Sequence, residues 1–183
     1  DGRSNLDEYL EGKDPNADDV APVVTAPADV VADSEGNLTS VELGEATATD
    51  ALDGALTPVA DNPGPYASGA YTVTWSATDA AGNAGSATQA VVVTPQVSTQ
   101  PKGRAVEGGT FVLKVNLNGA PPAYPVEIPF TLGGTAEVGV DYTADAEAVV
   151  ITEGRSGMLI FSIASDEVEE GTEVIEVTLG DPA

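Results

Sequence analysis

The sequence contains no cysteine and no histidine. The lack of cysteine excludes disulfide bonds and thiolate metal sites, and the lack of both residues excludes every catalytic scheme that needs an imidazole or a thiol. Basic residues are also scarce, because six Lys and Arg stand against 30 Asp and Glu and give a net charge of -24. Nucleic acids and anionic membrane surfaces bind positively charged surfaces, so we expect neither as a partner.

Long apolar runs and aromatic side chains are rare as well. No apolar run approaches the roughly 20 residues of a membrane-spanning helix, so we expect no direct membrane insertion by this segment. Aromatic residues make up 5% of the chain and hydrophobic residues 42%. Acidic chains with few aromatics can be disordered, but here the hydrophobic residues alternate with polar ones. This period of two, with abundant Thr, Val, Ala and Gly, predicts folded all-β domains.

The first residues contain half of a calcium loop. The run Asp1-Gly-Arg-Ser-Asn-Leu-Asp-Glu8 matches the second half of a twelve-residue loop, in which an Asp precedes the turn glycine and a Glu closes the loop six residues after it. The ligands in that match are Asp1, the carbonyl of Arg3, Asn5 and Glu8. The alternative is a short capped helix in a solvated linker, without an ion.

Extended to Pro15, this run resembles the bacterial thrombospondin type 3 repeat, a calcium-binding linker between surface domains. The resemblance implies a partial calcium loop and a short helix in residues 1–20. No secretory signal peptide is visible, and the chain begins inside the loop motif. Both observations favour a segment of a longer protein.

Short strand signals recur through residues 21–95 and are separated by turn residues, which is typical of a β-sandwich. In the clearest run, Tyr71, Val73, Trp75 and Ala77 alternate with polar residues. We expect Trp75, the only tryptophan, in the core, with a sugar-stacking surface as the alternative. The expected strands are 22–25, 28–32, 38–43, 46–49, 71–78 and 87–94.

The run from Tyr71 to Asn83 is similar to the HYR domain, an immunoglobulin-like module of extracellular adhesion proteins, and the Asp50-Ala-Leu-Asp-Gly54 motif fits the same family. We interpret Asp79 as an acceptor for backbone N–H groups in a tight hairpin, in preference to a metal ligand. Residues 21–95 carry nine carboxylates and no basic residue. Because these carboxylates are scattered along the sequence, we interpret them as aids to solubility.

Residues 96–183 show a second set of alternating strands, which predicts a second core. Pro129 lacks an N–H, so its strand is expected at a sheet edge or with a local bulge. The stretch from Ser165 to Glu173 holds five acidic residues in nine, and Glu107 and Asp141 add carboxylates beside glycines. Such like charges repel, and oxygen ligands without His or Cys suit calcium. Solvated acidic turns without an ion are the alternative.

Three motifs in this region resemble a Calx-β domain: Val106 to Gly109, Gly134 to Thr143 and Asp166 to Glu173. The resemblance implies a calcium-binding sandwich with ions between the loops at one end. Two departures are a Glu at position 167, where the family often has Asp, and a missing last strand. The implied ligands are Glu107, Asp141, Asp166, Glu167, Glu170 and Glu173, with Asp145 and Glu169 as weaker candidates.

Together these patterns predict two tandem immunoglobulin-like β-sandwiches, with domains at 1–20, 21–95 and 96–183. The expected function is a non-enzymatic, calcium-binding structural or adhesive segment of a larger secreted or cell-surface bacterial protein. Its partners would be calcium ions and a surface protein or glycan. The alternative is a polysaccharide- or ligand-binding accessory module of a secreted hydrolase. Tyr66 and Tyr124, which lie beside prolines in loops, are the only platforms that the sequence offers for it.

Overall fold

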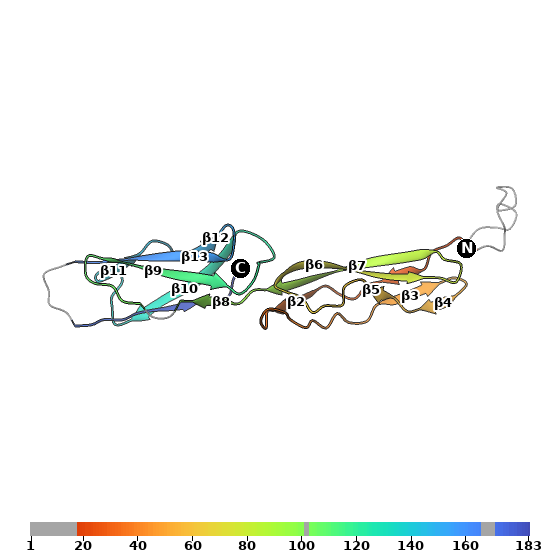
Figure 1. The fold of residues 1–183 in the computed structure, drawn as a ribbon, viewed down its shortest axis with the longest axis horizontal. Helices are drawn as coiled ribbons and strands as arrows, with labels where there is room; N and C mark the ends of the chain where they lie inside the picture. Colours follow the sequence, from red (N-terminus) through yellow and green to blue (C-terminus); the bar gives the residue numbers. More distant parts are fainter. Residues whose placement is uncertain (1–17, 101–102, 166–170) are drawn as a thin grey trace. The chain divides into compact units, whose positions relative to one another are not determined.

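The computed structural model describes residues 18–100, 103–165 and 171–183. Within these ranges every regular element is a β-strand, which confirms the all-β prediction (Figure 1). The helix expected near the N-terminus lies outside the described residues. The described part of the chain contains no helix long and apolar enough to cross a membrane.

The chain divides into two compact units. Among the described residues, unit 1 contains 18–31, 40–65 and 71–91, and unit 2 contains 32–39, 66–70 and the remainder from 92 onward. The strands in chain order are β1 (Val23–Thr25), β2 (Val30–Asp33), β3 (Thr47–Asp50), β4 (Gly54–Leu56), β5 (Val59–Ala60), β6 (Gly69–Thr78), β7 (Ala84–Thr94), β8 (Val97–Thr99), β9 (Thr110–Leu117), β10 (Val126–Gly134), β11 (Tyr142–Ala144), β12 (Ala148–Ile151), β13 (Ser156–Ile163) and β14 (Ile175–Leu179).

The first seven strands form two sheets with the orders β1-β3-β4 and β2-β7-β6-β5. The long strands β6 and β7 are joined by the turn after Thr78 (Figure 1). Alternation along β6 is confirmed, because Val73, Trp75 and Ala77 are buried while Thr72 and Ser76 are exposed. The predicted core position of Trp75 is therefore correct.

The strand expected at 38–43 is wrong. Only Thr39 makes an isolated antiparallel bridge, to Tyr66. Residues 40–43 face a turn that contains Pro63 and Pro65. Because proline has no N–H, this turn cannot continue the backbone hydrogen bonding beyond Thr39. The short strands β4 and β5 were not predicted, because two or three residues carry too little periodicity to be recognised.

The other strands form sheets with the orders β12-β10-β14 and β11-β13-β9-β8. Inward side chains of these strands make one core, which includes Val115, Ile128, Leu159 and Phe161, each fully buried. The Tyr142 ring meets the Phe161 ring edge-on, with centroids 5.8 Å apart. Edge-to-face contacts of this kind add to the burial of apolar area, so the predicted second core is present.

The edge position proposed for Pro129 is wrong, because β10 lies between β12 and β14. Pro129 pairs with Ala148 as the last residue of the β12 ladder, and Phe130 begins the β14 ladder. Phe130 pairs with Leu179, whereas Glu127 exchanges hydrogen bonds with Ala183, so the partner segment has one extra residue opposite Pro129, as the alternative of a local bulge predicts. The Pro129 carbonyl still accepts a hydrogen bond from the N–H of Gly180, at 2.8 Å.

Candidate metal centre

Three aspartates from separate segments of unit 1 converge. Asp18 precedes β1, Asp53 lies in the turn between β3 and β4, and Asp79 follows β6. One carboxylate oxygen from each lies within 4.8 Å of the others. Within the ranges that the structure describes, this aspartate triad is the one group of three acidic side chains that meets this criterion.

The turn that carries Asp53 is organised by Asp50. The Oδ1 atom of Asp50 accepts hydrogen bonds from the N–H groups of Leu52, at 2.8 Å, and Asp53, at 3.0 Å. Gly54 closes the turn with a φ of +75°, a value that glycine adopts without strain. The Oδ2 atom of Asp53 then accepts the N–H of Ala80, at 2.7 Å, so this turn is attached to the turn after β6.

The turn after β6 is organised in a similar way by Asp79 and Asn83. The Oδ1 atom of Asp79 accepts the backbone N–H of Asn83, at 2.7 Å, and its Oδ2 atom accepts the Asn83 side-chain amide, at 2.8 Å. These bonds confirm the predicted hairpin role of Asp79. The Asn83 amide also donates to the carbonyl of Asp18, at 3.0 Å, and so holds the segment before β1 against the hairpin.

Two of these carboxyl groups have lowered pKa values. Burial of Asp79 favours the neutral acid, but the hydrogen bonds from Asn83, Gly82 and Ala81 outweigh this effect and bring its pKa below the usual value. The N–H groups of Asp53 and Leu52 lower the pKa of Asp50. Both side chains are therefore anionic at neutral pH.

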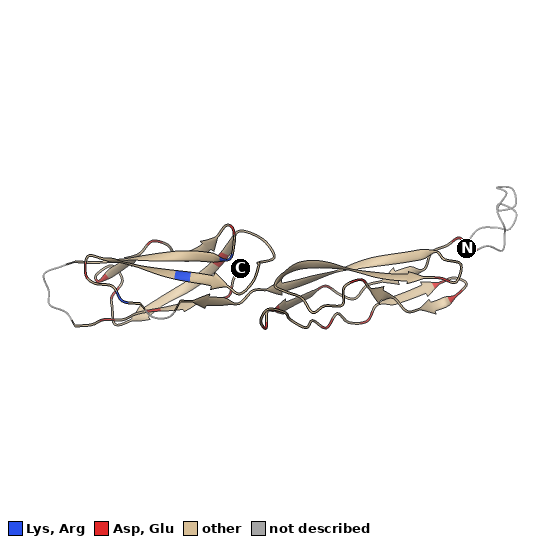
Figure 2. Cartoon of the chain, viewed as in Figure 1, with Lys and Arg blue, Asp and Glu red and all other residues tan. Residues whose placement is uncertain are grey.

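No basic residue lies in residues 18–100, and Figure 2 marks the Asp and Glu positions of these loops in red, with no blue Lys or Arg position beside them. Among the residues of unit 1 that the structure describes, the aspartate triad therefore has no Lys or Arg as a cationic partner. Calcium binds carboxylate and carbonyl oxygens at about 2.3–2.6 Å, so two ligands on opposite sides of one ion stand roughly 5 Å apart. The spacing of the triad matches what one such ion can bridge.

The lowered pKa values predict loss of stability in acid. Below the ordinary pKa of 3.8 the unfolded chain takes up protons that folded Asp79 and Asp50 resist. The stabilisation is present above about pH 4 and is lost as the pH falls through the lower folded-state values. Thermal melts from pH 6 to pH 2, with a chelator present, should show this decline.

The same melts on an Asp79→Asn variant separate this cause from general charge effects. The introduced amide cannot titrate, so the melting temperature of the variant should fall less between pH 4 and pH 2 than that of the unchanged chain. Asp29→Asn is the control at an exposed aspartate that accepts one backbone N–H. Equal declines in all three proteins would contradict the assignment.

Seven of the ten ligands predicted from the sequence lie outside the described residues, namely Asp1, Arg3, Asn5, Glu8, Asp166, Glu167 and Glu170. The structure describes the other three. Glu107 and Glu173 are exposed, and Asp141 is half-buried, with its Oδ2 atom accepting the N–H of Glu137 at 2.6 Å. Of the two weaker candidates, Glu169 is not described and Asp145 accepts the N–H of Ile160 at 2.8 Å.

The loops that carry Glu107 and Asp141 do converge. The N–H of Ala164 donates to the carbonyl of Asp141, at 2.8 Å, and the carbonyl of Ala164 accepts the N–H of Gly108, at 3.1 Å. Two of the three motifs, those around Gly108 and Asp141, thus meet at Ala164, the residue that follows β13. The presence of an ion there stays a prediction.

The aspartate triad is the feature that the sequence interpretation missed. Asp53 and Asp79 were counted among carboxylates scattered along the sequence, and Asp79 was assigned to a hairpin, whereas the structure brings both close to Asp18. The available signal was the pairing of two Asp-containing turns, Asp50–Gly54 and Asp79–Asn83, each with a glycine that closes it. Their meeting depends on the pairing of distant strands, which no local pattern shows.

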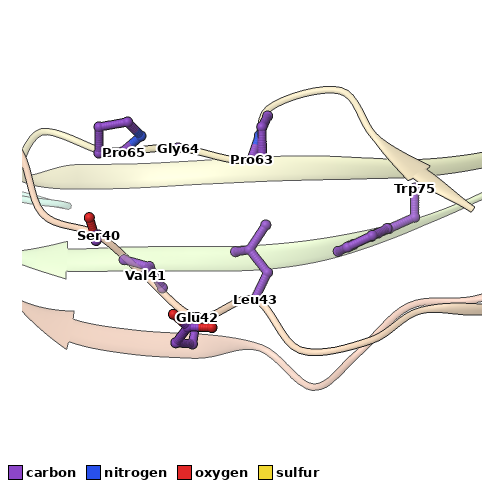
Figure 3. Close-up of a pocket in the computed structure, with 8 residues that line it drawn as sticks. All are labelled: Ser40, Val41, Glu42, Leu43, Pro63, Gly64, Pro65 and Trp75. Atoms are coloured by element: carbon purple, nitrogen blue, oxygen red, sulfur yellow. The ribbon is translucent and has the colours of Figure 1, made fainter.

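A groove of about 480 Å³ lies elsewhere in unit 1, between residues 40–43 and the turn 63–65. Figure 3 shows Leu43 and the Trp75 ring directed toward its interior, with Pro63 on the opposite wall. Trp75 is only 9% exposed, so the groove presents little of its ring. Tyr66 is buried and cannot serve as a surface platform, whereas Tyr124 is 45% exposed and its hydroxyl donates to the Gly154 carbonyl.

Comparison with known proteins gives no family assignment. No protein-family model, no curated protein and no solved structure matches the chain.

Proposed function

We propose that this chain is a non-enzymatic, calcium-binding structural or adhesive segment of a larger secreted or cell-surface bacterial protein, built from tandem immunoglobulin-like sandwiches. The observation that carries the proposal is the aspartate triad, where three carboxylates from distant segments approach within 4.8 Å. Three negative charges at this separation repel one another unless a cation lies between them. Oxygen-only ligands in turns suit calcium above other metals.

The bound ion would act as a clamp. Asp18 belongs to the segment before β1, and Asp53 and Asp79 belong to two turns, all within unit 1. An ion shared by all three would fix this segment and both turns together. The stabilisation follows mass action and reaches about 2.7 kcal/mol when calcium exceeds its Kd a hundredfold.

Unit 2 supports a second calcium site in the same proposal. Glu107 and Asp141 lie in loops joined through Ala164, next to the acidic stretch that resembles the Calx-β motif. In this arrangement calcium would hold the loops at the end of β13 as the aspartate triad holds the turns of unit 1. Extracellular calcium lies in the millimolar range, which suits modules that bind with Kd values of about 0.1–1 mM.

Calorimetric titration of the chelator-treated chain with calcium tests the proposal. We expect saturable binding with a Kd of about 0.1–1 mM and weaker binding of magnesium, which requires shorter bonds and a nearly octahedral site. Asp53→Asn should remove one class of sites, and Glu107→Gln should affect a separate class. Absence of binding up to about 10 mM calcium, ten times the upper end of that range, would reject the calcium-dependent function.

The groove beside Trp75 is the observation that favours the second candidate, a polysaccharide- or ligand-binding accessory module. Sugar rings stack on exposed aromatic faces, and the 9% exposure of Trp75 leaves little face available. The aspartate triad therefore supports the calcium function more strongly. Quenching or a spectral shift of Trp75 fluorescence on adding oligosaccharides would favour the ligand-binding function over the calcium-binding one.

A further inference from the structure

The loop after β2 carries the sequence Glu35-Gly36-Asn37-Leu38-Thr39. The chain has seven asparagines, and only Asn37 is followed two positions later by Ser or Thr. Asn-X-Thr with X other than proline is the acceptor sequence for N-linked glycosylation, which occurs on surface loops of exported proteins. We propose that Asn37 is an N-glycosylation site whose donor is a lipid-linked oligosaccharide pyrophosphate.

The loop presents Asn37 to solvent. Asn37 is exposed, and its neighbour Leu38 is 58% exposed. A Cβ atom built on Gly36 would meet nothing within 4 Å, so the space around the tip is open. A glycan attached to Asn37 would therefore begin at an exposed position of the loop.

The two ends of the loop are fixed, so the glycan would have a defined origin. The N–H of Ser34 donates to the Thr94 carbonyl, at 2.8 Å. Thr39 and Tyr66 exchange two backbone hydrogen bonds, at 2.7 and 2.9 Å. The four residues between Ser34 and Thr39 therefore form a short loop whose two ends are hydrogen-bonded to other segments, with Asn37 near its tip.

The burial of Thr39 determines when Asn37 can be glycosylated. A transferase recognises the hydroxyl of the acceptor sequence, but Thr39 is only 2% exposed in the folded chain. Its Oγ1 atom also accepts the N–H of Glu35, at 3.0 Å. Transfer must therefore precede closure of this loop, while the chain is being exported and before it is fully folded.

The chemistry is a simple displacement. The amide nitrogen of Asn37 attacks the anomeric carbon of the donor sugar, and a C–N bond forms as the C–O bond to the pyrophosphate breaks. The lipid pyrophosphate leaves with the bonding electrons, and the amide nitrogen gives up one proton to the surrounding water. The step needs no oxidant or reductant.

This inference rests on the exported location in the proposed function and not on calcium binding. The test is to express the chain with an export signal in bacteria that make a lipid-linked oligosaccharide and its transferase. Intact mass spectrometry should show the 18.4 kDa chain plus one glycan. A glutamate-specific protease should release residues 36–42, between Glu35 and Glu42, with the added mass on Asn37.

Variants then define the acceptor. Asn37→Gln and Thr39→Ala should lose the added mass completely, whereas Thr39→Ser should keep it. The matched control is Asn62→Gln, at an exposed asparagine outside any acceptor sequence, and it should remain modified. The exposed position of Asn37 means that Asn37→Gln should melt at the same temperature as the unmodified chain.

An unmodified exported chain, in cells where a reporter acceptor protein is glycosylated, would overturn the proposal. Added mass on a residue other than Asn37 would overturn it as well. The calcium titration is independent of these outcomes, because none of the triad aspartates lies in the loop. Glycosylation without calcium binding would reject only the proposed clamp, and calcium binding without glycosylation would reject only the acceptor site.

Discussion

Replacing Gln89 by leucine is expected to lower the free energy of unfolding by about 2–5 kcal/mol, a loss large enough to unfold a marginal domain. Gln89 is fully buried and serves three partners at once. Its Oε1 atom accepts the indole N–H of Trp75, at 3.0 Å. Its Nε2 atom donates to the carbonyls of Ala28, at 2.6 Å, and Leu43, at 2.8 Å.

The loss of stability arises from the polar groups that no longer have a hydrogen-bond partner once Gln89 is replaced. Leucine nearly matches the volume of glutamine, so no large cavity forms, and the apolar surface buried by leucine offsets a small part of the loss. The Trp75 N–H and the two carbonyls lose their partner inside a protein, where each unsatisfied polar group costs about 1–3 kcal/mol. Ala28 is exposed and Leu43 is half-buried, so water relieves some of the penalty at their carbonyls.

Urea unfolding followed by circular dichroism measures this effect, with Gln96→Leu as the matched control. Gln96 is exposed, so the same chemical change there should alter stability by less than about 0.5 kcal/mol. In a Trp75→Phe background, Gln89→Leu should cost about 1–2 kcal/mol less, because the indole donor is already absent. Equal costs in both backgrounds would show that the Trp75 bond contributes nothing.

Calcium is expected to raise the melting temperature of the chain, and Asp53→Asn is expected to remove most of that rise in unit 1. At 10 mM calcium, with a Kd of about 0.1–1 mM, the gain is about 1.4–2.7 kcal/mol. For a unit of this size, that corresponds to roughly 5–20 °C. Differential scanning calorimetry in calcium and in EDTA gives the shift directly.

Asp53→Asn is the informative change because asparagine keeps an oxygen that can accept the Ala80 N–H while it removes one negative charge. Without calcium the variant should be as stable as the unchanged chain or slightly more so, because repulsion within the aspartate triad is reduced. With calcium it should gain little. A variant that is merely misfolded would lose stability in both conditions.

Asp61→Asn provides the matched control. Asp61 is exposed and accepts one backbone N–H, from Thr74 at 2.8 Å, but it does not belong to the aspartate triad. Its variant should respond to calcium like the unchanged chain. If Asp53→Asn and Asp61→Asn respond alike, the aspartate triad is not the calcium site.

The sequence predicted the long strands well and the candidate site poorly, for a physical reason. Alternation along β6, β9 and β13 is a local property, and each strand is long enough to show it. The strand expected at 38–43 does not form, and the cause lies outside that segment. The residues that face it include Pro63 and Pro65, which have no N–H for hydrogen bonding between strands. A period of two indicates which side chains can point inward, but it does not identify the pairing partner.

The site required distant information of a different kind. Asp53 and Asp79 are 26 residues apart (79 minus 53), and Asp18 precedes both of them. Each aspartate is an ordinary residue for the turn in which it lies, so the local sequence does not indicate a metal site. The family resemblances indicated a site in the densest acidic stretch. The three aspartates of the triad are far apart in the sequence, and they converge because of how β1, β3 and β6 are placed.

The bridge that Asn83 makes to the Asp18 carbonyl joins residues 65 positions apart in a chain that has no cysteine. A covalent cross-link that closes a loop of this length would reduce the entropy of the unfolded chain by the equivalent of about 4 kcal/mol. With a cation shared by Asp18 and Asp79, the protein would gain a comparable constraint from an ionic contact. Its strength would then depend on the surrounding calcium concentration rather than on the local redox potential.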